Sequence, residues 1–102
     1  RVNPPPPIVG GARVVLWASL DAPLASDDAH RRIAGRLADG PVVALAICVC
    51  EDGFFLFRCN ASWQVVADTW HASLEEARGQ AEFEHDGLAL NWTASNGEAG
   101  AR

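Results

Sequence analysis

The strongest pattern in the chain is a series of three apolar runs near its middle. Residues 42–50 are apolar at every position, and residues 54–59 and 63–71 are rich in aromatic or β-branched side chains. Runs of this length and composition, bounded by turn-forming residues, are typical of β-strands. We therefore expect three consecutive antiparallel strands.

Two short segments between these runs predict hairpin turns. Asp52-Gly53 favours a type I′ turn, because both central residues of that turn need a positive φ. This turn would place Cys48 opposite Phe57. Residues 60–62, Asn-Ala-Ser, predict a three-residue loop before the next strand.

Period-two alternation divides the strand residues between two faces of the predicted sheet. The first face carries Ala46, Cys48, Cys50, Phe55, Phe57, Cys59, Trp63, Val65 and Ala67. The second face carries Leu45, Ile47, Val49, Phe54, Leu56, Val66 and Trp70, with Glu51, Arg58, Gln64 and Asp68 at its borders. We expect helices to cover the first face. The second face is too apolar to contact water, so we expect it to pack against a terminal segment or, in a symmetric homodimer, against a second copy.

Capping signals predict two helices. Residues 13–20 form a further strand-like run, and Ser26 then has the character of an N-cap for a helix that extends to about Asp39. Ser73 and Glu76 have the spacing of a capping box, in which each side chain satisfies a backbone N–H of the other residue. The second helix should therefore begin at Ser73.

These elements predict an α+β fold with a mostly antiparallel sheet of four to five strands and two helices on one face. The order is β-α-β-β-β-α, with a possible last short strand over residues 88–92. Residues 1–12 are expected to form a Pro/Gly-rich tail, residues 13–93 a single domain, and residues 94–102 a polar C-terminal tail.

Charge narrows the range of partners. The chain of 102 residues has a net charge of −5, and its basic side chains are all arginine. An acidic protein is a poor match for nucleic acid or an anionic membrane, and it favours a basic protein partner. The longest apolar run is too short to span a bilayer, and three cysteines make no disulfide framework. We expect a cytoplasmic protein.

One group of polar residues lies where the last predicted strand meets the second helix. Asp68, Thr69, His71 and Glu75 gather there, and His71 would be the general base of a hydrolytic site. On a regular strand, however, Asp68 points away from Thr69 and His71, and the sequence has no G-x-S-x-G motif. The alternative is that His71 has a structural role at the end of the strand. No catalytic residue is assigned.

Two sets of residues contain metal-binding side chains without a recognised spacing. One set is His71, Glu84, His85 and Asp86, and the other is Cys48, Cys50 and Cys59. Neither the H-E-x-x-H motif nor paired C-x-x-C motifs are present, and no phosphate-binding loop occurs. Free cysteines among aromatic residues are commonly small buried apolar groups. We expect no metal and no other cofactor.

Aromatic residues without an obvious internal place are candidates for an interface. These are Phe83, Trp70 and Trp92. Phe83 lies between Glu82 and Glu84, so it would be an apolar anchor within an acidic rim that suits a basic partner. The alternative is that Phe83 covers the sheet edge beside Trp92.

Residues 55–87 contain a recognisable pattern, C-x3-W…D-T-x-H-x-S-x-E-E-A…Q-A-E-F-E. Its positions are Cys59, Trp63, Asp68, Thr69, His71, Ser73, Glu75, Glu76, Ala77 and Gln80 to Glu84. The pattern resembles that of a family of small bacterial α+β proteins of unknown function. The resemblance implies a bacterial origin and an α+β fold, and it implies no activity.

The sequence thus favours a small acidic protein-interaction module that acts as a homodimer. One concrete version is a regulatory or immunity-like protein that masks a basic protein such as a toxin. The alternative function is a small-molecule-binding domain or minor enzyme with a site near Thr69, His71 and Glu75.

Overall fold

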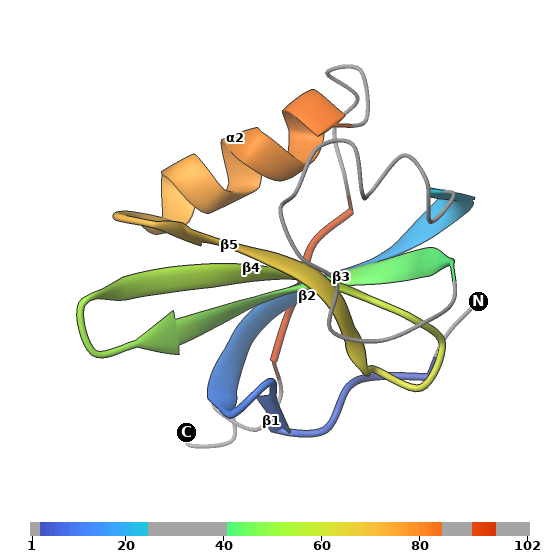
Figure 1. Cartoon of the computed structure of the whole chain (residues 1–102), viewed down its shortest axis with the longest axis horizontal. Coiled ribbons are helices and arrows are strands. Elements are labelled where there is room, and N and C mark those ends of the chain that lie inside the picture. Colours follow the sequence, from blue (N-terminus) through green and yellow to red (C-terminus); the bar gives the residue numbers. More distant parts are fainter. Residues whose placement is uncertain (1–2, 25–40, 85–90, 96–102) are drawn as a thin grey trace.

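The computed structural model of the protein describes residues 3–24, 41–84 and 91–95. The described elements are β1 (Ile8–Val9), β2 (Ala12–Leu24), β3 (Val42–Cys50), β4 (Gly53–Cys59), β5 (Val65–His71), α2 (Leu74–Glu84) and β6 (Thr93–Ala94). All strand pairs are antiparallel, in the order β1-β2-β3-β4-β5, and β6 pairs with β2. The sheet is curled, and α2 lies across one side of it (Figure 1). The predicted α+β class and antiparallel sheet are confirmed.

Several predicted elements differ from the observed ones. The described residues contain one helix and not two, and the helix expected over residues 26–39 lies outside the described ranges. Of the last short strand expected over 88–92, residues 88–90 lie outside the described ranges and 91–92 form no strand; the described strand that follows is β6 at Thr93–Ala94. Residues 8 and 9, expected in a tail, form β1.

A tight turn at Gly10-Gly11 connects β1 to β2. Both glycines have positive φ values, 60° and 83°, as the central residues of a type I′ hairpin turn do. A Cβ atom on Gly10 would lie 2.7 Å from the ring of Phe57, so the close approach also requires glycine. The glycine pair therefore folds the N-terminal hairpin onto the sheet.

The turn between β3 and β4 lies one residue before the predicted position. Cys50 pairs with Gly53, so Glu51 and Asp52 form the turn and Cys48 faces Phe55 instead of Phe57. Among the described non-glycine residues only Trp63 has a positive φ, so the turn is not type I′. The register differs by two residues, which leaves every β3 and β4 side chain on its predicted face.

A β-bulge at Val66 changes the predicted faces of β5. Arg58 pairs with Ala67, whereas the neighbouring Cys59 pairs with Val65, so one extra residue is inserted in β5. The alternation is reversed beyond this point. Trp70 lies on the first face and not on the second. The bulge carries no local sequence signal that period-two counting detects.

The face covered by the helix is the opposite of the one expected. Ala77 and Ala81 of α2 pack on the second face, in a cluster with Val42, Leu45, Ile47, Leu56 and Val66. The first face packs instead against the β1–β2 hairpin, in a cluster that includes Val9, Val14, Cys48, Phe57 and Trp63. Both faces are apolar, so alternation alone does not decide which one the helix covers. The surface assigned to the homodimer is therefore buried within the chain.

Two glycines give opposite predictions for substitution by alanine. Gly79 is exposed within α2, and nothing lies within 4 Å of an added Cβ. Gly79→Ala should raise the free energy of unfolding by about 0.5–1 kcal/mol, because glycine costs that much in a helix interior. Denaturant unfolding of the full chain measures the change.

Gly53 is the matched control. A Cβ there would lie 2.6 Å from the carbonyl oxygen of His71 and 2.6 Å from the ring of Trp70. Gly53→Ala should lower the free energy of unfolding by roughly 1–3 kcal/mol, since the backbone and the ring must shift. Equal effects of the two substitutions would contradict this packing.

Candidate functional site

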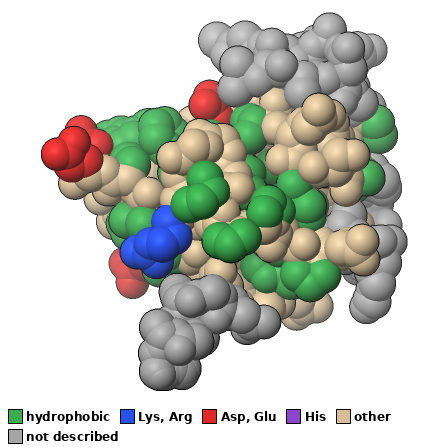
Figure 2. All heavy atoms as spheres, turned by 90° about the horizontal axis from the view of Figure 1, so that it is seen from below, with side chains coloured by type: hydrophobic (Ala, Val, Ile, Leu, Met, Phe, Trp, Pro, Cys, Tyr) green, Lys and Arg blue, Asp and Glu red, His purple; other side chains and the backbone are tan. Residues whose placement is uncertain are grey.

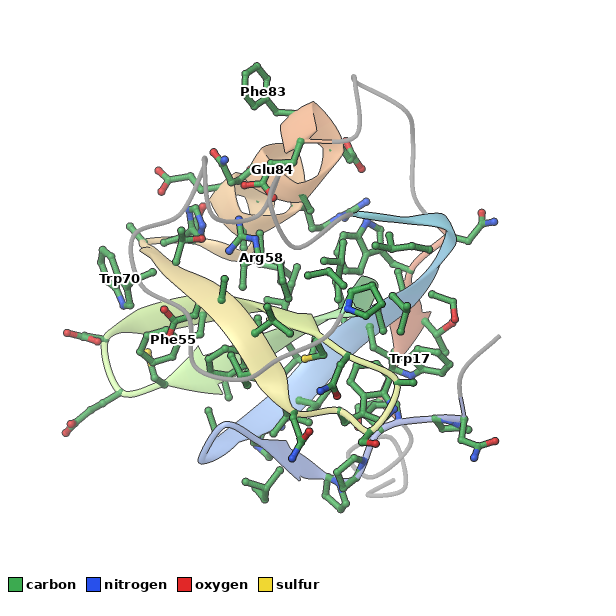
Figure 3. All side chains as sticks on the ribbon, turned by 45° about the vertical axis from the view of Figure 1, so that its right-hand side comes forward. Trp17, Phe55, Arg58, Trp70, Phe83 and Glu84 are labelled. Carbon is green, nitrogen blue, oxygen red and sulfur yellow. The ribbon has the colours of Figure 1, made fainter. Side chains whose placement is uncertain are left out.

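The central polar contact of the fold is made by Arg58, which is fully buried within β4. Its Nε and Nη2 donate to the two carboxylate oxygens of Glu84, at 3.1 and 2.6 Å. Its Nη1 donates to the carbonyl oxygen of Leu56 and to Oγ1 of Thr69, both at 3.0 Å. Figure 3 shows Arg58 and Glu84 facing each other beneath α2. Protein groups thus occupy all three guanidinium nitrogens.

Glu84 occupies an electrostatically poor position at the end of α2. A carboxylate is unfavourable near a helix C-terminus, and the last turn of α2 contains no basic residue. The side chain is nevertheless buried, and Gln80 Nε2 donates to it at 2.8 Å. Arg58 supplies the compensating charge, so the ion pair attaches the C-terminal end of α2 to the sheet.

A short hydrogen bond extends this network to the half-buried His71. Thr69 Oγ1 lies 2.7 Å from His71 Nε2. Because Arg58 only donates, the Thr69 hydroxyl accepts from it and its own hydrogen is available to His71 Nε2, which favours the neutral ring. Burial lowers the pKa of His71, and the positive charge of Arg58 lowers it further, against the opposing carboxylates of Glu76 and Glu84.

This arrangement contains a hydroxyl next to a neutral imidazole, as in a nucleophile and its general base. The hydroxyl oxygen, however, already accepts a hydrogen bond from Arg58. The guanidinium itself has no exposed surface with which to bind an anionic substrate or intermediate. The network is therefore explained by its structural role between α2 and β5.

The predicted N-cap at Ser73 is confirmed, whereas the Glu76 carboxylate reaches back to the N–H of Ala72 and not to that of Ser73. Glu76 N–H donates to Ser73 Oγ at 3.1 Å, and Ala72 N–H donates to Glu76 Oε1 at 3.2 Å. Glu76 is thus the first-turn carboxylate that acts on His71. Glu75 lines a shallow hollow on the outer side of α2, together with Arg78, Gly79 and Glu82.

The three candidate aromatic residues lie in different places. Phe83 is 73 % exposed and points away from the molecule (Figure 3), so it does not cover the sheet edge beside Trp92. Its expected acidic rim is incomplete, because Glu84 is buried in the ion pair. Trp92 is half-buried against the cluster under α2, and its buried Nε1 has no hydrogen-bond partner among the described residues.

Trp70 and Phe55 form an aromatic ledge on the first face, at the end of the sheet that carries the β3–β4 turn. The two residues are directly opposite each other in β5 and β4, and Phe55 stacks on Phe57 with ring centroids 5.4 Å apart. Trp70 is 48 % exposed, and its ring lies against Gly53, where a Cβ atom would collide with it. The ring is exposed and yet held in a defined position.

Carboxylates lie around the aromatic ledge. Asp68 is two residues from Trp70 on the same strand and face, since the residues opposite them in β4 are Phe57 and Phe55. Glu51 and Asp52 are exposed in the β3–β4 turn, beside Gly53. The ledge is therefore an apolar surface in an acidic environment.

The described residues contain no group of three or more His, Cys, Asp or Glu side chains arranged to hold a metal ion. Residues 85 and 86 of the His/carboxylate set lie outside the described ranges. Burial raises the pKa of both Cys48 and Cys59 to about 12, so these thiols stay protonated. They pack in the first-face cluster as small apolar groups.

Comparison of the chain with protein-family models, with curated proteins and with solved structures finds no match. The resemblance to a bacterial family stays a prediction. Within the described ranges, no helix has the length and apolar character needed to cross a membrane.

From the sequence, Arg58 is expected only at a border of the second face. Neither Phe55 nor Gly53 is among the predicted binding residues. A signal was present for Arg58, because it is the one charged residue in the strand 54–59. A buried charge needs a partner, and that partner is 26 residues away. No local pattern identifies Gly53 as the support of Trp70, because their contact depends on the pairing of β4 and β5.

Removal of one partner of the buried ion pair should destabilise the fold. Glu84→Gln should lower the free energy of unfolding by about 3 kcal/mol or more, since it leaves the Arg58 charge buried and uncompensated. Urea unfolding measures this loss. Glu82→Gln, on the same helix and partly exposed, should change the value by less than about 0.5 kcal/mol. Similar values for the two variants would contradict the structural role of the pair.

His71 should make stability depend on pH. Its pKa is lowered from 6.5 in the folded protein, so the unfolded chain binds more protons as the pH falls. The stability linked to His71 is therefore full above about pH 6.5 and is lost as the pH falls below that value. Unfolding free energies from about pH 8 to pH 5 should decrease more steeply in the wild type than in His71→Gln. Parallel profiles would contradict the lowered pKa.

Proposed function

We propose that the protein is a small acidic interaction module that binds a basic protein through the aromatic ledge of Phe55 and Trp70. The observation that supports it most directly is Trp70. The ring is half-exposed, although Gly53 and the neighbouring strand hold it in place. A large side chain that is fixed but not covered loses little conformational entropy when a partner covers it.

Tryptophan is well suited to the recognition of a basic partner. It is among the residues that contribute most to binding energy at protein interfaces, and its ring face attracts Arg and Lys cations. Figure 2 views the side of the molecule opposite α2, where hydrophobic side chains form several patches, and acidic groups with a basic side chain between them lie toward one edge. A cation over Trp70 would have Asp68 and the turn carboxylates Glu51 and Asp52 nearby.

Charge favours a basic partner over a second copy of the chain. The net charge of −5 would repel another copy, and two ledges in contact would bring their carboxylates together. The homodimer stays a prediction, although the second face first assigned to it is covered by α2. A regulatory or immunity-like protein that masks a basic toxin is the concrete form of this proposal.

A small-molecule or enzymatic site at Thr69, His71 and Glu75 has less support. Arg58 already donates to Thr69, and Glu75 lies in the hollow on the outer side of α2. We therefore assign no reaction to these residues.

The proposal predicts a specific loss of affinity. Once a basic partner has been recovered with the wild-type chain and purified, Trp70→Ala should weaken binding by at least about tenfold in calorimetric titration, because a buried aromatic anchor contributes 2 kcal/mol or more. Binding should also weaken as salt concentration rises.

Phe83→Ala is the matched control, since it removes an exposed aromatic ring that lies outside the ledge. It should leave the affinity within about twofold of the wild type. If Trp70→Ala folds normally and binds as tightly as the wild type, or if the recovered partner is acidic, the ledge is not the binding surface.

A further inference from the structure

A second aromatic surface on the first face is occupied by the chain itself. Trp17 of β2 and Trp63 of the β4–β5 loop meet edge to face, with ring centroids 6.0 Å apart and planes at 89°. Trp63 belongs to the first-face cluster, and Trp17 packs against it. We call this surface the tryptophan pair. The N-terminal segment that precedes β1 runs beside the β4–β5 loop (Figure 1).

Trp63 is held in an unusual backbone conformation. Its φ is 61°, in the left-handed region that a bulky side chain rarely adopts. The loop imposes this conformation: Trp63 N–H donates to the carbonyl oxygen of Asn60 at 3.0 Å, and Asn60 Oδ1 accepts from the N–H groups of Ser62 and Gln64. Such strain persists only where the surroundings impose it, and it is common at binding sites. The loop thus fixes the direction of the indole ring.

The indole N–H of Trp63 binds the proline-rich segment. Its Nε1 donates to the carbonyl oxygen of Asn3 at 2.9 Å, directly before the run Pro4 to Pro7. Along residues 3–7 only Pro5 is partly buried, and the others are exposed. One further bond, from Val14 N–H to the carbonyl oxygen of Pro7 at 2.9 Å, holds the end of the segment. Both ends of the segment are thus held through backbone carbonyls, those of Asn3 and Pro7, and Pro5 is its one partly buried proline.

Proline-rich segments are recognised by other proteins in the same manner. A polyproline II helix makes no internal hydrogen bonds, so its carbonyl groups are free to accept from a partner. Aromatic grooves bind such segments with low entropic cost because proline already fixes the backbone. The hydrogen bond at the tryptophan pair depends on a backbone carbonyl group that precedes the prolines, and not on any side chain specific to this protein.

We propose that the tryptophan pair is a binding site for a proline-rich segment in the polyproline II conformation, and that residues 3–6 are an internal ligand which such a segment from another protein can replace. The pairing of β1 with β2 begins at Ile8, and Pro7 has its own bond to Val14. Residues 3–6 can therefore leave while the β1–β2 hairpin stays in place. The internal segment competes at a high effective concentration, so the site binds external segments weakly until residues 3–6 are displaced.

The test compares two full-length chains. In one of them Pro4→Gly, Pro5→Ser and Pro6→Gly weaken the internal ligand, while Pro7 and β1 are retained. The probe is a blocked synthetic peptide with the sequence of residues 2–9, Val-Asn-Pro-Pro-Pro-Pro-Ile-Val. Titration followed through the indole N–H signal of Trp63 in NMR spectra reports binding at the site itself. The triple variant should bind the peptide at least about tenfold more tightly than the wild type, because the internal competitor is removed.

Two controls distinguish specific recognition of the proline-rich segment from non-specific binding. A peptide in which alanine replaces the four prolines should bind at least about tenfold more weakly, since it must lose more backbone entropy. Trp63→Phe in the triple-variant background keeps an aromatic ring but removes the indole N–H, and it should weaken binding about five- to tenfold. In that variant the Trp17 indole signal reports the titration.

The proposal is overturned if the folded triple variant shows no shift of the Trp63 signal at millimolar peptide, or if the alanine peptide binds equally well. If the triple variant does not fold, the same titration is made with Pro5→Ala alone. Failure of that variant to fold would make the segment an indispensable part of the core, which also overturns the proposal. None of these outcomes depends on Trp70 or on a basic partner.

Discussion

Burial of Arg58 is the constraint that most of the structure satisfies. An arginine cannot lose its proton, so its removal from water costs several kcal/mol unless a carboxylate and further acceptors surround it. Glu84 provides the carboxylate, and Leu56 and Thr69 provide the other acceptors. Because Arg58 faces the same side of the sheet as Leu56, α2 has to lie on the second face to bring Glu84 within reach. The position of the helix thus follows from one charged residue in an apolar strand.

The choice of face for α2 determines what covers the other side. The first face is left to the N-terminal hairpin, and Gly10 allows that hairpin to approach the ring of Phe57 closely. The hairpin is short, with β1 limited to Ile8–Val9, so it covers only part of the face. Phe55 stays half-buried and Trp70 half-exposed beyond its edge. The aromatic ledge is therefore a direct consequence of a cover that is too small for the sheet.

Periodicity predicted the elements better than their arrangement. The alternation over residues 42–71 and the Ser73–Glu76 spacing identified three strands and the start of α2, because these signals are local. The bulge at Val66, the early β3–β4 turn and the face covered by α2 depend on contacts between distant segments. The same difference between local signals and contacts of distant segments applies to the candidate binding residues. Trp70 and Asp68 were identified from composition, whereas the contacts that support Trp70 depend on the pairing of β4 with β5.

The first face thus presents two aromatic surfaces with different surroundings. At one end, Trp63, which packs against Trp17, binds the chain's own proline-rich segment, and that segment carries no charged side chain from residue 3 to residue 7. At the other end, Phe55 and Trp70 have no internal cover among the described residues, and Asp68, Glu51 and Asp52 lie around them. Apolar area attracts partners without regard to charge, so the neighbouring groups determine which partner fits. A neutral segment with free carbonyls fits the first surface, and a cationic side chain fits the second.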